Sequence, residues 1–434
     1  MNEIIKLSNA ALITQHGECL LHKDLYISGG RIARICDSGT LQPDLTPSDI
    51  IDCTFYYVSP GLVNLHAHTA MNIFKGIAED VSAEVWFNDM IWPYESKMKE
   101  QDIYTGTLLG IAEMINNGVT AVADHYFGEE QVLQAAKDTG IRMDIAPTIF
   151  GTAPDFKDRL AVVSDFIQKH QGDSSRINLR FGPHSDYTCP EETLSEIVME
   201  AKRLRLPVHL HLSETKLQVD QSLQRTGKTP FRVLYDAGGF DVPVLVAHGL
   251  WITEEDISFI NDKTWFAFCP KTYMRLAAGR GGFFDLSDRL PYSFGTDGAA
   301  SSGTVSTLEQ ARLFALLEKF ERNNAMLHPA KEIWQKLMAG HQVFSSGTGR
   351  IEEGATADLV IWDLNLPDTM SHYDPVSSIL YGANSANVRY TMVEGEFLKF
   401  DGKLKMDFKR TANDAMNLQK ELLTRGKGKA KVFY

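Results

Sequence analysis

Paired cysteines are the most obvious absence in this sequence. Its five cysteines are scattered over 434 residues without a CxxC motif: Cys19, Cys36, Cys53, Cys189 and Cys269. This spacing argues against a disulfide framework and against a zinc site built from thiolates. We therefore expect a protein of the reducing cytoplasm.

Long hydrophobic runs are missing as well. No apolar stretch reaches the roughly 18 residues that a transmembrane helix needs, so we expect no membrane span. The first twenty residues, MNEIIKLSNAALITQHGECL, carry an early acid and lack the continuous apolar segment of a secretory signal. Both absences agree with a cytoplasmic location.

Positive charge is in short supply. The chain has 43 Lys and Arg against 56 Asp and Glu, which gives a formal net charge of -13. A negative protein repels nucleic acid and anionic lipid, so we expect neither as a partner. Hydrophobic residues at 44% and charged residues at 23% are typical of a globular protein. The expected partner is a small molecule.

The pattern of apolar residues and turn signals changes twice along the chain. Residues 1–57 and 346–403 alternate short apolar runs with turn signals, as small antiparallel strands do. We expect these two segments to pair into one composite β domain, a small β-sandwich. Residues 404–434 are expected to form a helix that ends in a basic tail, RGKGKAK, exposed to solvent.

Residues 58–345 instead alternate buried runs with amphipathic helical stretches. Eight strand candidates follow one another in this region: the run at Val63, TAVADHYF, RMDIAPTIF, NLRFGPHS, LPVHLHLSE, PVLVAHGL, WFAFCP and LPYSFGTDG. Parallel neighbours need crossover connections, which are usually helices. The pattern predicts an α/β fold, a (β/α)8 TIM-type barrel with the small β-sandwich attached.

Histidines and one acid recur where the predicted strands end. His66 and His68 stand two residues apart in NLHAH, so both side chains lie on one face of the first strand. His184, His211, His248 and Asp297 follow at later strand ends, and the carboxyl ends of barrel strands meet at one mouth. Imidazole nitrogens and a carboxylate oxygen suit a catalytic zinc ion that keeps one position open for water.

Three further residues lie near this group. Glu214 comes three residues after His211, where its carboxylate can reach the water or the substrate and act beside Asp297 in proton transfer. His209 shares the face of His211 but lies one layer deeper, which favours a core histidine. For His125, in DHYF, a structural position is also favoured.

The motifs PGLVNLHAH, GPHSDYT, HLHLSET, VAHGL and GTDGAAS, in this order and followed by GRIEEGATADLVIWD, resemble the amidohydrolase superfamily. Within it they are similar to the 5'-methylthioadenosine and S-adenosylhomocysteine deaminase branch. The resemblance covers nearly the whole chain. It implies a hydrolytic deaminase that binds one divalent metal per subunit, Zn²⁺ with Fe²⁺ as the alternative, and that forms a homo-oligomer, a dimer or a tetramer.

The resemblance also implies roles for individual residues. The metal ligands are His66, His68, His211 and Asp297, while His248 orients the attacking water and Glu214 shuttles a proton to a ring nitrogen. The substrate contacts that it implies are Glu95, Arg159, His184, Glu214 and Ser301. The implied reaction is metal-assisted attack of hydroxide on an amidine-type ring carbon with loss of ammonia, in which Asp297 accepts the water proton.

Two departures from the family pattern concern the substrate. Family members that hold the homocysteine carboxylate resemble this chain around APTIF, but they carry an arginine at the position of Thr148. Arg159 does match a second arginine of those members. After Cys269 and Pro270 the family usually shows a Ser-Asn pair, whereas this chain reads KTYMR over residues 271–275. We therefore expect an adenine nucleoside, with 5'-methylthioadenosine or adenosine preferred over S-adenosylhomocysteine.

Three other functions compete with this interpretation. A deaminase of a free heterocycle, such as guanine, a pterin or a triazine, would use the same metal chemistry but would have no use for Glu95 near a ribose. A hydrolase of cyclic amides with two bridged metals would need a lysine at the RFGPHS strand end, where none is present. A metal-free binding scaffold would not need the complete ligand set.

Overall fold

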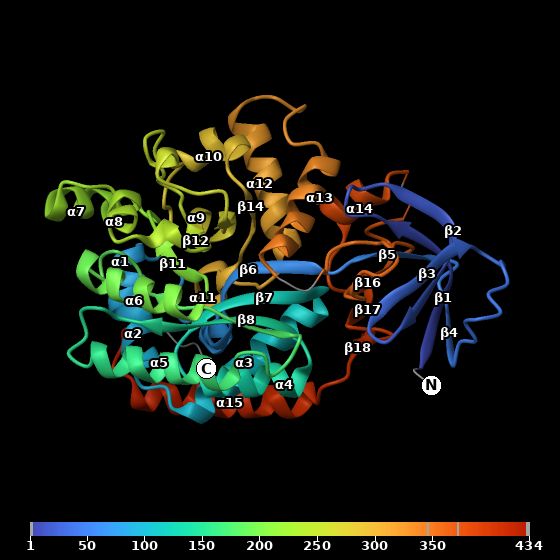
Figure 1. Ribbon diagram of the computed structural model, residues 1–434, viewed down its shortest axis with the longest axis horizontal. Helices are drawn as coiled ribbons and strands as arrows, with labels where there is room; N and C mark the ends of the chain where they lie inside the picture. Colours follow the sequence, from blue (N-terminus) through green and yellow to red (C-terminus); the bar gives the residue numbers. More distant parts are fainter. Residues whose placement is uncertain (1–2, 345–346, 371–372, 431–434) are drawn as a thin grey trace.

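The computed structural model describes residues 3–344, 347–370 and 373–430. Figure 1 shows a barrel surrounded by helices and, at its right side, a separate sheet in which the blue N-terminal and the red C-terminal strands lie together. The predicted barrel and β-sandwich are therefore confirmed. The predicted domain boundary at residues 345 and 346 lies outside the described residues, and the proposed division of the chain stays a prediction.

The barrel strands match the predicted segments in order. They are β6 (Leu62–His68), β7 (Val119–Tyr126), β8 (Arg142–Ile149), β9 (Ile177–Leu179) with β10 (Gly182–Pro183), β11 (Val208–Leu212), β12 (Val244–His248), β13 (Thr264–Phe268), and β14 (Tyr292–Phe294) with β15 (Asp297–Gly298). The fourth and the eighth strand are each interrupted and form two short pieces. Buried apolar residues fill these segments because a parallel sheet is covered on both faces.

The strands close into a ring of parallel neighbours. From β6 the pairing runs through β7 and β8 to β9 and β10, and a second run joins β11, β12, β13 and β14. Two bridges, Phe181 to Val208 and Ser185 to His211, join the two runs on one side. On the other side β15 pairs with β6 and closes the barrel. The carboxyl ends of all strands therefore face one mouth.

Helices connect the strands on the outside. The longer ones are α3 (Glu100–Asn116), α4 (Glu129–Thr139), α5 (Phe156–His170), α6 (Glu191–Leu204), α7 (Lys216–Thr226), α8 (Pro230–Asp236), α12 (Thr307–Glu321) and α13 (Ala330–Ala339). Short turns fill the remaining connections: η3 (Gly239–Asp241), η4 (Asp256–Ser258), α9 (Pro270–Arg275), α10 (Phe283–Leu286), η5 (Ser287–Arg289), α11 (Ala299–Ser302) and η6 (Gly340–Val343).

One connection is much longer than the others and lies at the barrel mouth. Between β6 and α3 the chain forms η1 (Thr69–Phe74), α1 (Ala83–Val85), the π-helix η2 (Trp86–Ile91) and α2 (Trp92–Glu95). π-Helical turns are rare and occur mostly at functional sites. We call residues 86–95 the mouth segment.

The second sheet is built from both ends of the chain. Its path runs β19-β18-β17-β16-β5-β1-β2-β3, and β4 pairs with β1. The bounds are β1 (Ile4–Ile13), β2 (Cys19–Ser28), β3 (Arg31–Asp37), β4 (Asp49–Asp52), β5 (Tyr56–Pro60), β16 (Leu359–Asp363), β17 (Val388–Val393), β18 (Glu396–Phe400) and β19 (Lys403–Leu404), with helix α14 (Pro375–Gly382) between β16 and β17. Side chains from opposite ends of this path share one buried cluster, so the sheet folds over itself.

A buried ion pair joins this sheet to the amino-terminal face of the barrel. Arg142 at the start of β8 donates from Nε and Nη2 to the two carboxylate oxygens of Asp358, at 2.8 and 3.2 Å. Both side chains are fully buried. The pair lies on the side of the barrel away from the mouth, so it serves the assembly of the fold.

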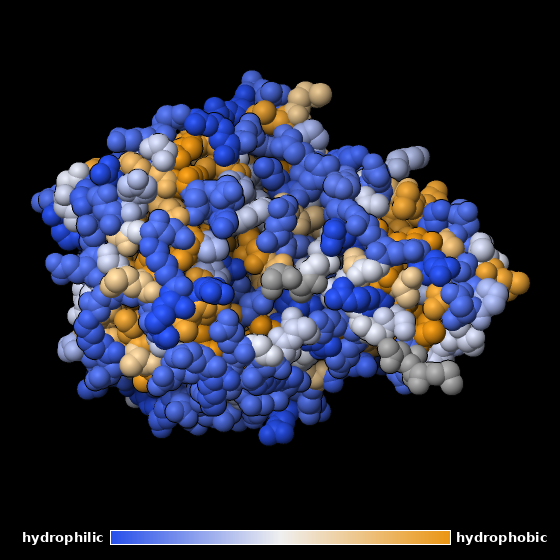
Figure 2. Space-filling model, viewed as in Figure 1, coloured by the Kyte–Doolittle hydropathy of each residue, from blue (hydrophilic) through white to orange (hydrophobic). Residues whose placement is uncertain are grey.

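The chain ends in α15 (Phe408–Arg425), which packs along α3. Figure 2 shows that hydrophilic residues dominate the lower edge of the molecule, where α15 lies in Figure 1. Within the described ranges, no helix is both long and apolar enough to cross a membrane. In the described part of the basic tail Lys427 and Lys429 are exposed, as expected, whereas Gly426 is buried against Tyr94.

Candidate metal centre and substrate cavity

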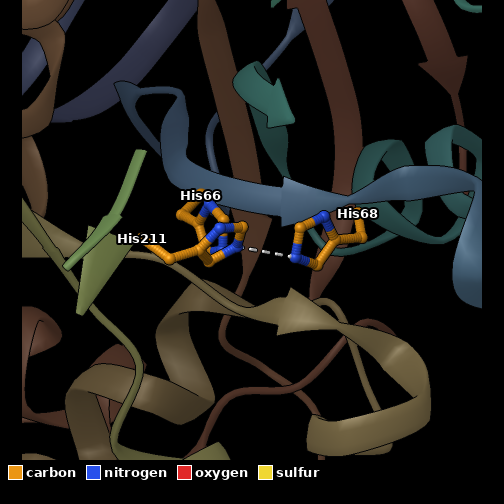
Figure 3. Close-up of side chains that lie close together, drawn as sticks. All are labelled: His66, His68 and His211. Carbon is orange, nitrogen blue, oxygen red and sulfur yellow. Dashed lines mark hydrogen bonds between the residues drawn. The ribbon is translucent and has the colours of Figure 1, made fainter. Parts of the chain in front are cut away.

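Four side chains from distant parts of the chain meet at the barrel mouth. The first strand brings His66 and His68, the fifth brings His211, and the eighth brings Asp297. Asp297 Oδ1 lies 3.2 Å from His68 Nε2 and 3.6 Å from His66 Nε2. His211 Nε2 lies 3.1 Å from His68 Nε2, as the dashed line in Figure 3 shows. The residues predicted as ligands thus point their polar atoms at one another.

Backbone carbonyls fix the orientation of two of the rings. The Nδ1–H of His68 donates to the carbonyl oxygen of His125 at 2.6 Å, and the Nδ1–H of His211 donates to that of His184 at 2.8 Å. A hydrogen bond of this kind sets the tautomer and leaves the lone pair of Nε2 free for a metal. Both free nitrogens face the cluster.

The third ring, that of His66, contacts a histidine deeper in the barrel. Its Nδ1 lies 3.0 Å from Nε2 of His209, which is fully buried, so the prediction that His209 belongs to the core is confirmed. Gly295 lies behind this ring, where an added Cβ would come within 2.9 Å of the Cβ of His66. A larger residue at position 295 would therefore press on the base of the His66 side chain.

The donor set fits a divalent metal ion. Within the described residues, His66, His68 and His211 offer ligand atoms within 4.8 Å of one another, and so do His66, His248 and Asp297. The Nε2 atom of His66 is buried and finds no hydrogen-bond partner in the described structure. Such an orphaned nitrogen is costly unless something binds it.

The pKa shifts show which groups of the cluster attract positive charge. Burial lowers the pKa of His66 to about 3, which keeps the ring neutral. Burial alone would also lower the pKa of His68, but the hydrogen bond and charge of Asp297 raise it to about 9. For Asp297, burial opposes ionisation, yet the neighbouring His66 and His68 hold its pKa well below the usual range. The cluster therefore combines neutral imidazole, an ionised carboxylate and a strong preference for positive charge.

His248 is held by a tyrosine in the segment that departs from the family pattern. In α9, the hydroxyl of Tyr273 accepts the backbone N–H of Cys269 at 3.0 Å. The same hydroxyl lies 3.3 Å from Nδ1 of His248. If that hydroxyl donates its own proton to Nδ1, the proton of a neutral His248 lies on Nε2. That nitrogen lies 3.7 Å from Oε1 of Glu214.

The backbone is strained at two of these positions. His248 has a φ of 71° and Asp297 a φ of 57°, both in the left-handed region that disfavours residues with a Cβ. Such conformations persist only where the surroundings enforce them, and they are common at functional sites.

A cavity opens above the cluster. Beside His68, His211, His248, Asp297 and Glu214, its lining is rich in aromatic side chains: Trp86, Phe87, Trp92, Tyr126, Phe127, Phe150 and Tyr187. Sequence reasoning missed these aromatic residues, although the sequence WFNDMIWPY is unusually aromatic for a connection between a strand and a helix.

Three residues predicted to contact the substrate line this cavity. Glu95 is buried and accepts the hydroxyl proton of Tyr126 at 2.6 Å, and burial raises the pKa of its carboxyl. His184 packs against Phe150 with ring centroids 4.8 Å apart, and burial lowers its pKa to about 3. Glu214 stands at the edge of the cluster beside His248.

Two other predicted contacts are placed elsewhere. Arg159 is absent from the described lining, because its two terminal nitrogens bind the carboxylate of Glu129 at 2.8 and 2.9 Å. The hydroxyl of Ser301 donates to Oδ2 of Asp297 at 2.5 Å, so it orients the acid and does not line the described cavity. A substrate contact of either residue stays a prediction, and Arg159 would first have to leave Glu129.

Thr148 and His125 form a pair on the cavity wall. The hydroxyl of Thr148 lies 3.1 Å from Nδ1 of His125, and both residues line the cavity. His125 is buried, as expected of a structural histidine, but it also borders the space for a ligand. Thr148 is thus a neutral residue already engaged with its neighbour.

This fold and this cluster define a metal-dependent hydrolase of the barrel type. The model of the Amidohydrolase family matches residues 57–398, and the chain belongs to that family. It is a metal-dependent aminohydrolase of the family, because its sequence relatives and one of its solved structural neighbours are named deaminases.

Two relatives and one solved structure illustrate the similarity. A 5-methylthioadenosine/S-adenosylhomocysteine deaminase from Dictyoglomus thermophilum is 34% identical over 82% of this chain and 85% of its own length. A 5'-deoxyadenosine deaminase from Methanosarcina acetivorans is 30% identical over 98% and 99%. The structure of a zinc-bound adenosine deaminase from Xanthomonas campestris superposes with a TM-score of 0.92 at 25% identity and covers 97% of this chain and 98% of that one.

Proposed function

We propose that this protein is a zinc-dependent hydrolytic deaminase of adenine nucleosides that carry a small uncharged 5' group. The observation that carries the proposal is the position of the histidine and aspartate cluster at the closed end of an aromatic cavity. The names of the relatives support an adenine nucleoside as the substrate. The products are the corresponding inosine-type nucleoside and ammonia.

His66, His68, His211 and Asp297 are the proposed ligands of one zinc ion per chain, with iron(II) as the alternative. When bound, a metal of this kind lowers the pKa of water from 15.7 to about 7 and so supplies a nucleophile at neutral pH. The orphaned Nε2 of His66 and the carbonyl-fixed rings of His68 and His211 support this ligand set.

We assign His248 to orienting the attacking water and not to the ligand set. Geometry alone allows it as a ligand together with His66 and Asp297. We assign the hydroxyl of Tyr273, which already accepts from Cys269, as the donor to Nδ1; Nε2 then carries a proton and has no lone pair to offer. A protonated Nε2 is instead a hydrogen-bond donor directed into the cavity.

The two carboxylates divide the proton transfers. Asp297 accepts a proton from the attacking water, and Ser301 holds its second oxygen in place during that transfer. Glu214 donates a proton to the ring nitrogen next to the carbon under attack, which neutralises the negative charge that would otherwise develop there. The proton held by Asp297 then passes to the departing amino group, which leaves as ammonia, and the remaining hydroxyl proton returns to Glu214 as the carbonyl forms.

Glu95 and His184 are the proposed contacts for the nucleoside itself. The carboxylate of Glu95 keeps one oxygen for the ribose hydroxyls while the other accepts from Tyr126. The neutral imidazole of His184, packed against Phe150, borders the cavity where the flat base would stack.

The outer part of the cavity favours an uncharged 5' group. The acids of the described lining are Glu95, Glu214 and Asp297, and no lysine or arginine is among the lining residues. Arg159 is neutralised by Glu129. A homocysteine carboxylate bound in this cavity would lose its hydration, gain no counter-ion and lie beside other carboxylates. Transfer of such an unpaired charge from water costs free energy. Methylthio or methyl groups, by contrast, gain from burial against Trp92 and Phe87.

A panel of substrates tests this function directly. Ammonia release by the zinc-loaded protein is measured with 5'-methylthioadenosine, 5'-deoxyadenosine, adenosine, S-adenosylhomocysteine, guanine, a pterin and a triazine. We expect the first two to give the largest kcat/KM and S-adenosylhomocysteine a much smaller one. Turnover of a free heterocycle without turnover of any nucleoside would refute the proposal. A homo-oligomer, a dimer or a tetramer, stays a prediction for light scattering to check.

A further inference from the structure

The described end of the chain crosses the outer side of the mouth segment. After α15 the chain leaves the helix at Gly426 and passes over Tyr94, which is 4% exposed and faces away from the cavity lining. We call residues 425–430 the C-terminal strap. The mouth segment therefore lies between the cavity on one side and the strap on the other.

Two glycines let the strap lie against the ring of Tyr94. A Cβ at Gly426 would come within 2.3 Å of Cδ1 of Tyr94, and a Cβ at Gly428 within 2.3 Å of its Cε2. These contacts lie on opposite edges of one ring, and real Cβ atoms do not approach so closely. The alternation of glycine in RGKGKA is thus matched to Tyr94.

Polar contacts anchor the strap to Asp89 within the mouth segment and to two residues that follow it, Lys97 and Asp102. The backbone N–H of Lys429 donates to the carbonyl oxygen of Asp89 at 2.8 Å. Arg425 donates to the carbonyl oxygen of Lys97 at 3.0 Å and forms an ion pair with the buried carboxylate of Asp102 at 2.6 Å. The pair between the side chains of Lys429 and Asp89 is mostly exposed and contributes little.

The mouth segment contacts the strap on one side and lines the cavity on the other. Tyr94 is followed directly by Glu95, and the two side chains point to opposite sides, one to the strap and the other to Tyr126 and the cavity. Trp86, Phe87 and Trp92 line the cavity from the same segment. Packed interiors transmit displacements, so a shift of Tyr94 moves its neighbour Glu95.

We propose that the C-terminal strap positions Glu95 and thereby sets the affinity for the ribose of the substrate. This inference rests on the proposed deaminase function. The strap residues touch neither the metal cluster nor the described cavity lining, so they act through the mouth segment and are positioning residues. The strap is expected to affect substrate binding and to leave the chemical step alone.

The test is the variant Gly428→Val, with Lys427→Val as the matched control, because Lys427 is exposed and receives the same side chain one residue earlier. For Gly428→Val we expect KM for 5'-methylthioadenosine to rise about tenfold, the size of one lost hydrogen bond to a charged group. We expect kcat and zinc content to stay near the wild-type values. The inhibition constant of free adenine, which lacks the ribose, should not change.

A second variant guards against misfolding. Lys429→Pro removes the backbone N–H that donates to Asp89 without adding bulk to the ring contact, and it should give the same pattern. An unchanged KM in both folded variants overturns the strap proposal, and so does an equal loss of adenine and nucleoside binding. If the wild type deaminates no adenine nucleoside, the proposed function itself fails, which is a separate result.

Discussion

Replacing Tyr273 by Phe removes one hydroxyl group and keeps the ring that packs on Phe268. Two hydrogen bonds disappear. His248 loses the donor that keeps its proton on Nε2, and the buried N–H of Cys269 loses its acceptor. The first loss concerns catalysis and the second concerns stability, so the two effects are measured separately.

The expected sizes follow from these contacts. Partners that orient a histidine in a metal site typically contribute 10-fold to 100-fold to activity, and we expect the lower end, about tenfold in kcat or about 1.4 kcal/mol. KM should change little, because Tyr273 does not belong to the described cavity lining. The unpaired N–H of Cys269 should lower the free energy of unfolding by about 1 to 3 kcal/mol.

Steady-state kinetics, metal analysis and chemical denaturation check this prediction together. Tyr292→Phe is the control, since Tyr292 is also buried in the barrel but does not line the described cavity. Zinc should remain at one ion per chain, because His248 is not a ligand under the proposed assignment. A wild-type kcat would refute the tautomer argument. Loss of zinc with an intact fold would instead place His248 among the ligands.

Three further predictions concern other parts of the molecule. Glu214→Gln should remove most of kcat and leave zinc content unchanged, because an amide cannot supply the proton; near-normal turnover would exclude the shuttle role. Arg142→Met should lower the free energy of unfolding by about 3 to 5 kcal/mol, because it leaves Asp358 buried and unpaired. Adding Asp358→Leu should recover most of that loss, and a double variant as unstable as the single one would contradict the reasoning. Burial lowers the pKa of Lys399 from 10.5 to about 8, so between these values the unfolded chain binds more protons. The stability of the wild type relative to Lys399→Met should therefore rise from pH 8 to 10.5 in urea titrations, and a flat difference would contradict the shift.

The barrel and the ligand cluster could be predicted from the sequence because both follow from local patterns. Buried runs alternating with helical stretches define the strands, and the carboxyl ends of parallel strands meet at one mouth whatever their separation in the chain. His66 and Asp297 are separated by 231 positions in the sequence. Each could still be assigned to the barrel mouth, because each lies at the carboxyl end of a predicted strand.

The rest depends on contacts between segments that no local pattern relates. Nothing in the sequence near Arg159 indicates that Glu129 binds both of its terminal nitrogens. This pair keeps the guanidinium of Arg159 out of the described cavity lining. Tyr273 could be identified only as a departure from the family pattern, because its partner His248 belongs to another strand. The packing of the strap could not be predicted for the same reason. The ring of Tyr94, against which its two glycines lie, comes more than 300 residues earlier in the chain.

Burial along the cavity determines which end of a nucleoside enters first. Trp92 and Phe87 are each 41% exposed and mark the outer end, whereas Asp297 at the cluster is 7% exposed. A purine ring needs the proton donor Glu214 near its ring nitrogen, and an apolar 5' group needs aromatic contacts, so both demands give the same orientation. Chemistry is therefore confined to the closed end and selectivity to the open end. Because the described lining offers an anionic 5' group no lysine or arginine as a counter-ion, we expect carboxylate-bearing substrates to be disfavoured.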